Sequence, residues 1–421
     1  MRLSPAVNVD DEPSGFRCGT DAKMRVVFVT NICPHYRVRT FETLSAYCSV
    51  KYYFFSAGNE WYWQRNHGTR TGHFECEYLK GVAVGGTRIT PTLVTKLLKE
   101  PCDVFVKCIN GRFALPVTYL VSRLRRKPFV LWTGIWMTLQ TPFHRLIYPL
   151  TRYIYRNADA IVVYGEHVKR YLMSQGIQAE KIFVAAHAID NSFYSKVIDH
   201  HETQKLLDRL RINRNQRIVL YLGRMEAHKG LTYLVEAFQR LTSDDAVLLL
   251  AGDGAESNRL RELVFTLGMT DRVRFASYVP PDETPTYYAL AYVSVLPSIT
   301  TKVSKETWGL VANEAMNQGC PVIASDAVGA AAGGLIQDGV NGFIVPERNP
   351  EGLAAAIQRL LDDPCLRQRM SAESRAIVSK WDNELMVLGF RQALDYVTGG
   401  VESLSTLSDL TNTLQHTTVR K

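Results

Sequence analysis

The sequence lacks the features that mark membrane-spanning, secreted and metal-binding proteins. Its longest apolar stretches, residues 129–139 and 246–251, fall well short of the ~20 residues that span a bilayer. Residues 1–23 carry acidic side chains where a secretory signal would need an apolar run. The eight cysteines form no CxxC pair or regular framework, which is typical of a reducing compartment. We therefore expect a cytoplasmic chain without a transmembrane helix, a disulfide or a structural metal.

Acidic residues are scarce in the first half only. Residues 23–200 hold 24 lysines and arginines against 11 acidic residues, whereas the second half is nearly balanced. This asymmetry indicates an anionic partner for the first half: a nucleic acid, an anionic lipid surface or a phosphate-bearing acceptor. The cations are not set in a recognisable nucleic-acid-binding module, so we expect no nucleic-acid partner, and a basic nucleic-acid-binding protein remains the alternative from another class.

Short apolar runs alternate with helical patterns along most of the chain. In the first half they predict the buried strands of one parallel sheet, at residues 24–30, 51–56, 104–108, 129–132, 160–164 and 182–186. After a polar stretch at 197–215, the alternation predicts a second set of strands at 218–222, 246–251, 273–275, 293–296, 321–324 and 342–345. The pattern predicts an α/β protein with two Rossmann-like, doubly wound domains.

The length of 421 residues exceeds what one core usually organises, which supports two domains. We predict an N-terminal domain at residues 24–200 and a C-terminal domain at 201–380. The segment 381–398 is predicted to be a helix that returns to the N-terminal domain. A disordered leader at 1–23 and a flexible tail at 399–421 complete the chain.

Two cations follow the first strand of the second domain. The strand ends at Gly223, Arg224 offers a planar fork for two phosphate oxygens, and Lys229 adds a compact charge, a pair that suits a diphosphate. Gly252 and Gly254 form a GxG turn after the next strand, where the backbone can approach a ligand. Taken alone, the cations are equally compatible with a solvated loop, and the GxG pair is a weak signal.

Two glutamates eight residues apart flank a predicted helix start. Glu306 falls in a polar loop, and a helix that opens near Gly309 would point the free N–H groups of residues 308–311 at an anion. Glu314, about a turn and a half into that helix, would face the same cleft. One carboxylate would accept hydrogen bonds from sugar hydroxyls and the other from a ribose. Taken alone, a surface Glu306 and a capping Glu314 are the more ordinary interpretation.

The order of these motifs resembles that of the retaining glycosyltransferases of family 4, the large group 1 family with the GT-B fold. The series continues with Gly319–Ser325 and Asp338–Pro346, and the resemblance covers roughly residues 24–398. It implies transfer of a sugar, with retention, from a UDP- or GDP-linked donor, without an essential metal or other cofactor. It also implies a glycan or lipid-linked acceptor in cell-surface polysaccharide or glycolipid biosynthesis.

The resemblance assigns roles to residues of the second domain. Arg224 and Lys229 look like the diphosphate clamp, Glu306 like the carboxylate that contacts the donor sugar, and Glu314 like the ribose ligand. Backbone amides would face sugar and phosphate at Trp308, Gly309, Leu310 and Val311. The residues that would lie beside the nucleobase are Gly252, Asp253, Tyr278 and Val279.

In the first domain the resemblance is looser. The loop after the first strand resembles one that reaches donor and acceptor, with candidates Asn31, His35, Tyr36 and Arg37. Many family members have a histidine after the strand equivalent to residues 129–132, but this sequence has none there. Thr133 and Gly134 are the candidates for backbone contact instead, and the nearest histidine, His144, fits an ordinary helix surface.

Aromatic and basic residues gather at positions 122–127 and 132–156 of the first half. Such a surface suits anionic lipid headgroups, so we predict an enzyme that is peripheral on the inner face of the membrane. The ordinary alternative is that the aromatic residues belong to the core and the cations to a solvated face. A sugar-nucleotide epimerase and a glycan phosphorylase are the enzyme alternatives on the same architecture, although no lysine cofactor motif supports the phosphorylase.

Overall fold

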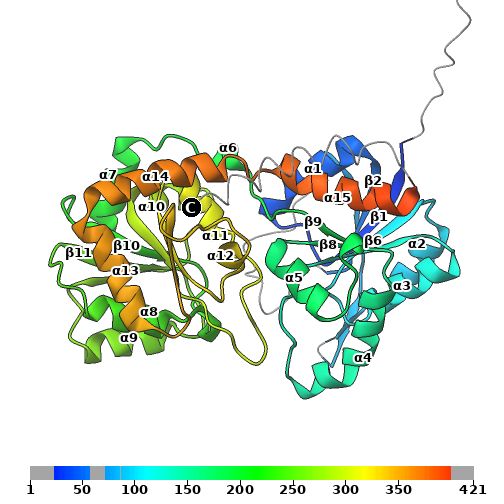
Figure 1. Ribbon diagram of the computed structural model, residues 1–421, viewed down its shortest axis with the longest axis horizontal. Coiled ribbons are helices and arrows are strands. Elements are labelled where there is room, and N and C mark those ends of the chain that lie inside the picture. The colour runs from blue at the N-terminus through cyan, green and yellow to red at the C-terminus, as the bar shows by residue number, and fades with distance from the viewer. Residues whose placement is uncertain (1–22, 57–71, 86, 400–421) are drawn as a thin grey trace, which may run out of the picture.

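The chain forms two α/β domains that lie side by side, each built around a parallel sheet (Figure 1). This computed structural model describes residues 23–56, 72–85 and 87–399. The predicted leader and tail therefore lie almost wholly outside the described residues. Within the described ranges, no helix is both long and apolar enough to cross a membrane.

Seven parallel strands form the first sheet in the order β3-β2-β1-β6-β7-β8-β9. Helices cover both faces, so the central strands are almost continuously apolar, and residues 26–29 are at most 1% exposed. The strands are β1 (Arg25–Thr30), β2 (Ser49–Phe54), β3 (Glu75–Tyr78), β6 (Val104–Cys108), β7 (Phe129–Thr133), β8 (Ala160–Val163) and β9 (Ile182–Val184). The helices are α1 (Val38–Tyr47), α2 (Pro91–Lys99), α3 (Ala114–Leu124), α4 (Pro142–Asn157) and α5 (Glu166–Ser174), and β4 (Val82–Val84) pairs antiparallel with β5 (Thr87–Ile89).

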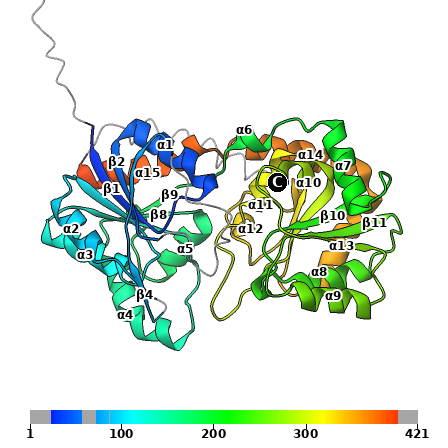
Figure 2. The same cartoon turned by 180° about the vertical axis from the view of Figure 1, so that it is seen from behind.

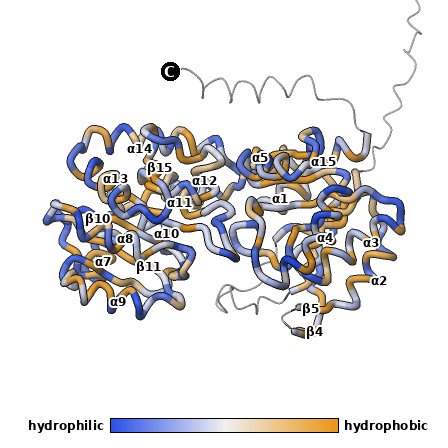
Figure 3. The backbone as a smooth tube through the Cα atoms, turned by 60° about the horizontal axis from the view of Figure 1, so that its bottom comes forward, coloured by the Kyte–Doolittle hydropathy of each residue, from blue (hydrophilic) through white to orange (hydrophobic). Residues whose placement is uncertain are grey.

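Six parallel strands form the second sheet in the order β12-β11-β10-β13-β14-β15. They are β10 (Arg217–Leu222), β11 (Ala246–Ala251), β12 (Val273–Ala276), β13 (Ala291–Leu296), β14 (Val322–Ser325) and β15 (Gly342–Val345). The surrounding helices are α7 (His200–Leu210), α8 (Leu231–Gln239), α9 (Ser257–Thr266), α10 (Thr284–Leu290), α11 (Val311–Asn317), α12 (Gly329–Ala332), α13 (Pro350–Asp362) and α14 (Pro364–Val378). Hydrophobic and hydrophilic residues alternate along surface helices such as α13 (Figure 3). The buried residues of α13 include Leu353, Ile357 and Leu360, and the helix packs against β14 and β15.

The two parallel sheets confirm the predicted doubly wound architecture. Each strand expected in the second half is present within two residues of its predicted ends. The polar stretch 197–215 contains α7, whose buried Leu206, Leu207 and Leu210 pack with α10 on the second sheet. The passage between the domains is therefore shorter than this polar stretch.

The last described helix, α15 (Asn383–Thr398), crosses back to the first domain. It packs against α1, β8 and β9, and both views of the ribbon show it beside α1 (Figures 1 and 2). Gly389 allows the close approach, because a Cβ there would lie 2.3 Å from the carbonyl oxygen of Val184. The Asn383 amide also donates to the carbonyl of Ile189 at 2.9 Å, close to the short helix α6 (Asn191–Tyr194).

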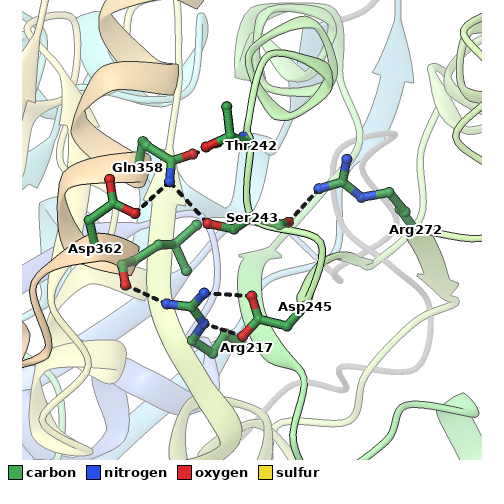
Figure 4. A network of polar contacts seen from close by, with 8 residues as sticks. Arg217, Thr242, Ser243, Asp245, Arg272, Gln358 and Asp362 are labelled. Carbon is green, nitrogen blue, oxygen red and sulfur yellow. Dashed lines mark hydrogen bonds and ion pairs between the residues drawn. The ribbon is translucent and has the colours of Figure 1, made fainter.

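A polar network fastens α13 to the start of the second sheet (Figure 4). Arg217 forms a two-pronged pair with Asp245 at 2.5 and 2.6 Å and also donates to a carbonyl of α13. Gln358 of α13 donates to the hydroxyl of Ser243 at 3.0 Å. Planar pairing of this kind fixes orientation as well as distance. The network therefore braces the amino ends of β10 and β11, which are the strand ends opposite the cleft.

Candidate active site

A cleft of about 530 Å³ lies between the domains, where the carboxyl ends of strands from both sheets face each other. Ligands of doubly wound proteins bind at this edge because the loops that follow the strands gather there. From the first domain, the loop after β1 and the ends of β6, β7 and β8 line the cleft. From the second, the loops after β10, β11 and β12 and the start of α11 line it.

All but two of the predicted site residues line this cleft. They are Gly223, Arg224, Lys229, Gly252, Asp253, Tyr278, Val279, Glu306, Trp308, Gly309, Leu310, Val311 and Glu314 from the second domain, with Asn31, His35, Tyr36 and Arg37 from the first. The prediction that Thr133 and Gly134 also line the cleft was wrong. Thr133 is fully buried and its hydroxyl bonds to that of Tyr155 at 2.9 Å, while Gly134 packs against the ring of Tyr164.

The loops that carry the cations pack backbone against backbone. A Cβ on Gly252 would lie 1.9 Å from the carbonyl oxygen of Gly223, and Gly252 has φ +132°, so this position requires glycine. The Tyr221 hydroxyl donates to the carbonyl of Arg224 at 2.6 Å and fixes the turn. Among the described residues, no side chain or carbonyl is hydrogen-bonded to the Arg224 guanidinium, so it lines the cleft with its donors unused.

Lys229 and Glu306 form an ion pair at the wall of the cleft. Their side chains are 17% and 14% exposed, and Ser298 donates to the same Glu306 oxygen at 3.2 Å. Burial alone would raise the pKa of Glu306, but the charge and hydrogen bond of Lys229 outweigh it and hold this pKa below its ordinary value. Glu306 is therefore ionised at neutral pH and can accept hydrogen bonds from hydroxyl groups.

Glu314 lies in the first turn of α11, not a turn and a half into the helix as predicted, because α11 begins at Val311. Gly309 has φ +90° and forms a turn that delays the helix start. The Tyr288 hydroxyl donates to Glu314 at 2.9 Å. Burial raises the pKa of Glu314 to about 7, so this carboxyl titrates near neutral pH.

Two buried cations support the first-domain side of the cleft. Arg37 donates to the His187 ring at 2.7 Å, and burial, followed by the charge of Arg37, lowers the pKa of His187. Lys107 donates to the carbonyl oxygen of Asn110 at 2.7 Å, and burial lowers its pKa to about 7. The Asn110 amide then donates to the side chain of Asn31 at 2.8 Å, which fixes both amides at the cleft wall.

Sequence reasoning missed several cleft residues at the ends of first-domain strands. They are Cys108, Asn110, Trp132, Tyr164 and His187. All five lie within two residues of the end of a predicted strand, so the rule that ligands bind at strand carboxyl ends could have found them. Trp308 also needs a qualification. Its side chain is 1% exposed and donates to Asn313, so it is core, and only its main chain is available to a ligand.

The comparisons with known proteins decide the family. Residues 202–377 match the family described as "Glycosyl transferases group 1", and residues 79–193 match "Glycosyltransferase Family 4". The alpha-D-kanosaminyltransferase of Streptomyces kanamyceticus is 31% identical over 64% of this chain and 70% of that protein. The chain belongs to the group 1 glycosyltransferases. This confirms the predicted enzyme class.

Other relatives of this glycosyltransferase match over a shorter span. A D-inositol 3-phosphate glycosyltransferase of Acidothermus cellulolyticus is 35% identical over 42% of this chain and 41% of that protein. The lipopolysaccharide core biosynthesis glycosyltransferase LpsE of Rhizobium meliloti is 33% identical over 42% of this chain and 49% of that protein. In these two matches the chain spans less than half of the relative's length.

Solved structures confirm the fold of the glycosyltransferase. Anabaena HepE, in complex with UDP and glucose, superposes with a TM-score of 0.69 at 21% identity, over 88% of this chain and 99% of that chain. The lipopolysaccharide biosynthesis glycosyltransferase WaaG gives a TM-score of 0.66 at 18% identity, over 89% and 100% of the two chains. The two facing sheets are therefore those of the GT-B fold.

Proposed function

We propose that the enzyme transfers a sugar from a nucleoside diphosphate sugar to an acceptor held against the first domain. The observation that carries this proposal is the convergence of two cations, Arg224 and Lys229, and two carboxylates, Glu306 and Glu314, on one cleft. The cleft volume of about 530 Å³ suits a ligand of this size. A sugar-nucleotide epimerase would bind the same donor, and product analysis with donor alone separates the two.

A uridine nucleotide is the first candidate for the donor, because Anabaena HepE was solved with UDP-glucose. A GDP-linked donor is the alternative. A thermal-shift panel of UDP, GDP, ADP and their sugars tests this choice, since a ligand at ~100 times its Kd stabilises the folded state by ~2.7 kcal/mol. If none of these ligands raises the melting temperature, the proposed function is contradicted.

The leaving diphosphate gains negative charge as the bond to the sugar breaks. Arg224, with its donors unused, and Lys229 are placed to stabilise that charge, as preorganised donors do at oxyanion sites. Glu306 would accept hydrogen bonds from the donor sugar, and Glu314 from the ribose. We propose that these residues act without an essential metal. Equal turnover with EDTA and with added Mg²⁺ or Mn²⁺ is the expected result.

We propose that the transfer retains the anomeric configuration. Among the described residues that line the cleft, the carboxylates are Asp253, Glu306 and Glu314, and all three belong to the second domain. Within the described residues that line the cleft, the first domain therefore offers no carboxylate base for direct attack by the acceptor, the route that inverts the anomeric configuration. An NMR time course of the product anomer tests this, and an inverted first product would refute it.

For the acceptor, we propose a glycan or lipid-linked molecule at the inner face of an anionic membrane, in cell-surface polysaccharide or glycolipid biosynthesis. Support comes from the outer face of α4, where Leu146, Leu150 and Tyr153 are 79%, 51% and 55% exposed. The same helix carries three arginines and no acidic residue. Beside it, Leu120 and Leu124 of α3 are 67% and 72% exposed, and the rings of Tyr119 and Tyr153 join the two helices at 6.0 Å.

This surface is smaller than the one predicted from the sequence. Trp132 is 3% exposed and belongs to the core of the first sheet, and Ile154 is buried as well. What remains on the outside is a mixed stripe of leucines and arginines along α4. Such a stripe favours shallow contact with anionic headgroups over deep insertion.

Co-sedimentation with vesicles tests the membrane proposal. The protein should bind vesicles that contain phosphatidylglycerol, and L146D/L150D should reduce binding at least tenfold. Phe265→Asp is the matched control, because Phe265 is also 79% exposed but lies on α9 of the second domain. Equal binding of all three proteins, or none by the wild type at low salt, would refute the proposal.

A further inference from the structure

The first domain forms hydrogen bonds to the segment that carries Glu306. The Trp136 indole N–H donates to the carbonyl oxygen of Glu306 at 2.9 Å, and the Gln140 N–H donates to the carbonyl of Lys302 at 2.9 Å. His167 Nε2 bonds to the carbonyl of Thr307 at 3.1 Å. All three contacts reach residues 302–307, which we call the Glu306 segment.

The Trp136 ring is itself held in one orientation. The Lys305 ammonium lies 3.6 Å from the ring centroid, and the His167 ring meets the indole edge-on with centroids 4.9 Å apart. Trp136 follows β7 in the first domain, whereas Lys305 belongs to the Glu306 segment of the second. The Trp136 indole therefore forms part of the contact between the two domains.

The carbonyl of Glu306 accepts one donor from each domain. From the second domain, the Gly329 N–H donates to it at 3.1 Å, and the Glu306 carboxylate is held by Lys229 and Ser298. From the first domain, Trp136 donates. Opening the cleft would break the Trp136 hydrogen bond and leave the contacts from the second domain in place. The first domain therefore adds one restraint to Glu306, whose ion pair with Lys229 is already formed.

We propose that Trp136 is a positioning residue that fixes Glu306 for the chemical step when the domains are closed. Trp136 does not line the cleft and acts through Glu306. The inference rests on the proposed function, in which Glu306 contacts the donor sugar. It makes the connection after β7, where the sequence lacks the family histidine, part of the catalytic arrangement through Trp136, the third residue after the strand.

Trp136→Phe removes the N–H donor and keeps a ring for Lys305. With the nucleotide sugar selected in the thermal-shift panel, we expect kcat to fall about five- to tenfold, the effect of one lost hydrogen bond. The Kd for UDP alone should stay within twofold, because UDP carries no donor sugar for Glu306. A merely structural defect would change both values.

Arg170→Ala is the matched control. Arg170 of α5 donates across the domains to the carbonyl of Ala332 at 2.8 Å without touching the Glu306 segment. We expect its kcat to stay within twofold of the wild type. An equal loss in both variants would show that closure in general matters, and would overturn the role of Trp136.

Amide hydrogen exchange provides a readout that needs no turnover. In Trp136→Phe, residues 302–307 should exchange at least threefold faster than in the wild type and in Arg170→Ala. Lys305→Met, which removes the cation from the ring, should produce a smaller increase. Unchanged exchange in Trp136→Phe would overturn the inference, whereas faster exchange in a protein that binds no nucleotide would contradict only the proposed function.

Discussion

The pair between Lys229 and Glu306 allows a prediction that separates chemistry from folding. Lys229→Ala removes a cation that we place on the leaving diphosphate, and loss of one preorganised donor lowers turnover ~100- to 1000-fold. It also leaves Glu306, 14% exposed, with the hydroxyl of Ser298 as its remaining side-chain partner. Breaking a fully buried pair costs about 3–5 kcal/mol, and since this one borders the cleft we expect about 2–3 kcal/mol.

The pH dependence of stability should change as well. In the wild type the lowered pKa of Glu306 means that the pair contributes stability above about pH 4.5, which is lost as the pH falls through the lowered pKa. In Lys229→Ala burial dominates and raises this pKa. Ionisation of Glu306 then destabilises the variant as the pH rises above 4.5, so the difference from the wild type should grow toward neutral pH.

The double variant K229A/E306Q completes the test. A neutral amide needs no counter-charge, so the double variant should regain most of the stability that K229A loses and none of its turnover. Urea unfolding at pH 5 and pH 7 and steady-state release of the nucleotide measure the two effects. Turnover of K229A within tenfold of the wild type would refute the assignment of Lys229 to the diphosphate.

Two further predictions concern the ribose and the loop glycine. Glu314 has a pKa raised to about 7, and ribose hydroxyls favour its ionised form, so the Kd for UDP-glucose should fall as pH rises from 6 to 8. Calorimetry should show this trend lost in Glu314→Gln, and an unchanged trend would remove Glu314 from the site. Gly252→Ala places a Cβ 1.9 Å from a carbonyl oxygen. It should lower the free energy of unfolding in denaturant by about 3 kcal/mol and should also abolish nucleotide binding. Gly268→Ala, also at positive φ but with no atom within 4 Å, should cost about 1 kcal/mol and leave binding intact.

Strands of the second domain were predictable because each is a short apolar run buried on both faces. The cleft followed from the same pattern, since the carboxyl ends of parallel strands meet at one edge and bring Gly223, Asp253 and Tyr278 together. Helix starts were harder. The positive φ of Gly309 decides where α11 begins, and local propensity alone does not distinguish a residue in the helix from one in the preceding turn.

Contacts between distant residues could not be predicted from the pattern. Thr133 is the last residue of the apolar strand β7 and was expected in the cleft, but its hydroxyl is hydrogen-bonded to that of Tyr155 from α4. Arg37 bonds to His187, 150 positions away, and Trp136 bonds to Glu306, 170 positions away. The first two pairs depend on how loops and helices pack within the first domain, and the third depends on how the two domains meet. No sequence periodicity encodes either arrangement.

The connections between the domains explain why such pairs can respond to a ligand. The described chain passes from one domain to the other near α6 and returns before α15, and the two passages lie at the same edge (Figures 1 and 2). They are joined by Asn191, which donates to the carbonyls of Val378 and Trp381 at 3.0 and 3.2 Å. Rotation about these passages leaves both sheets intact. It acts instead on the contacts that Trp136, Gln140 and His167 make with the Glu306 segment, and these contacts therefore couple closure of the cleft to the position of Glu306.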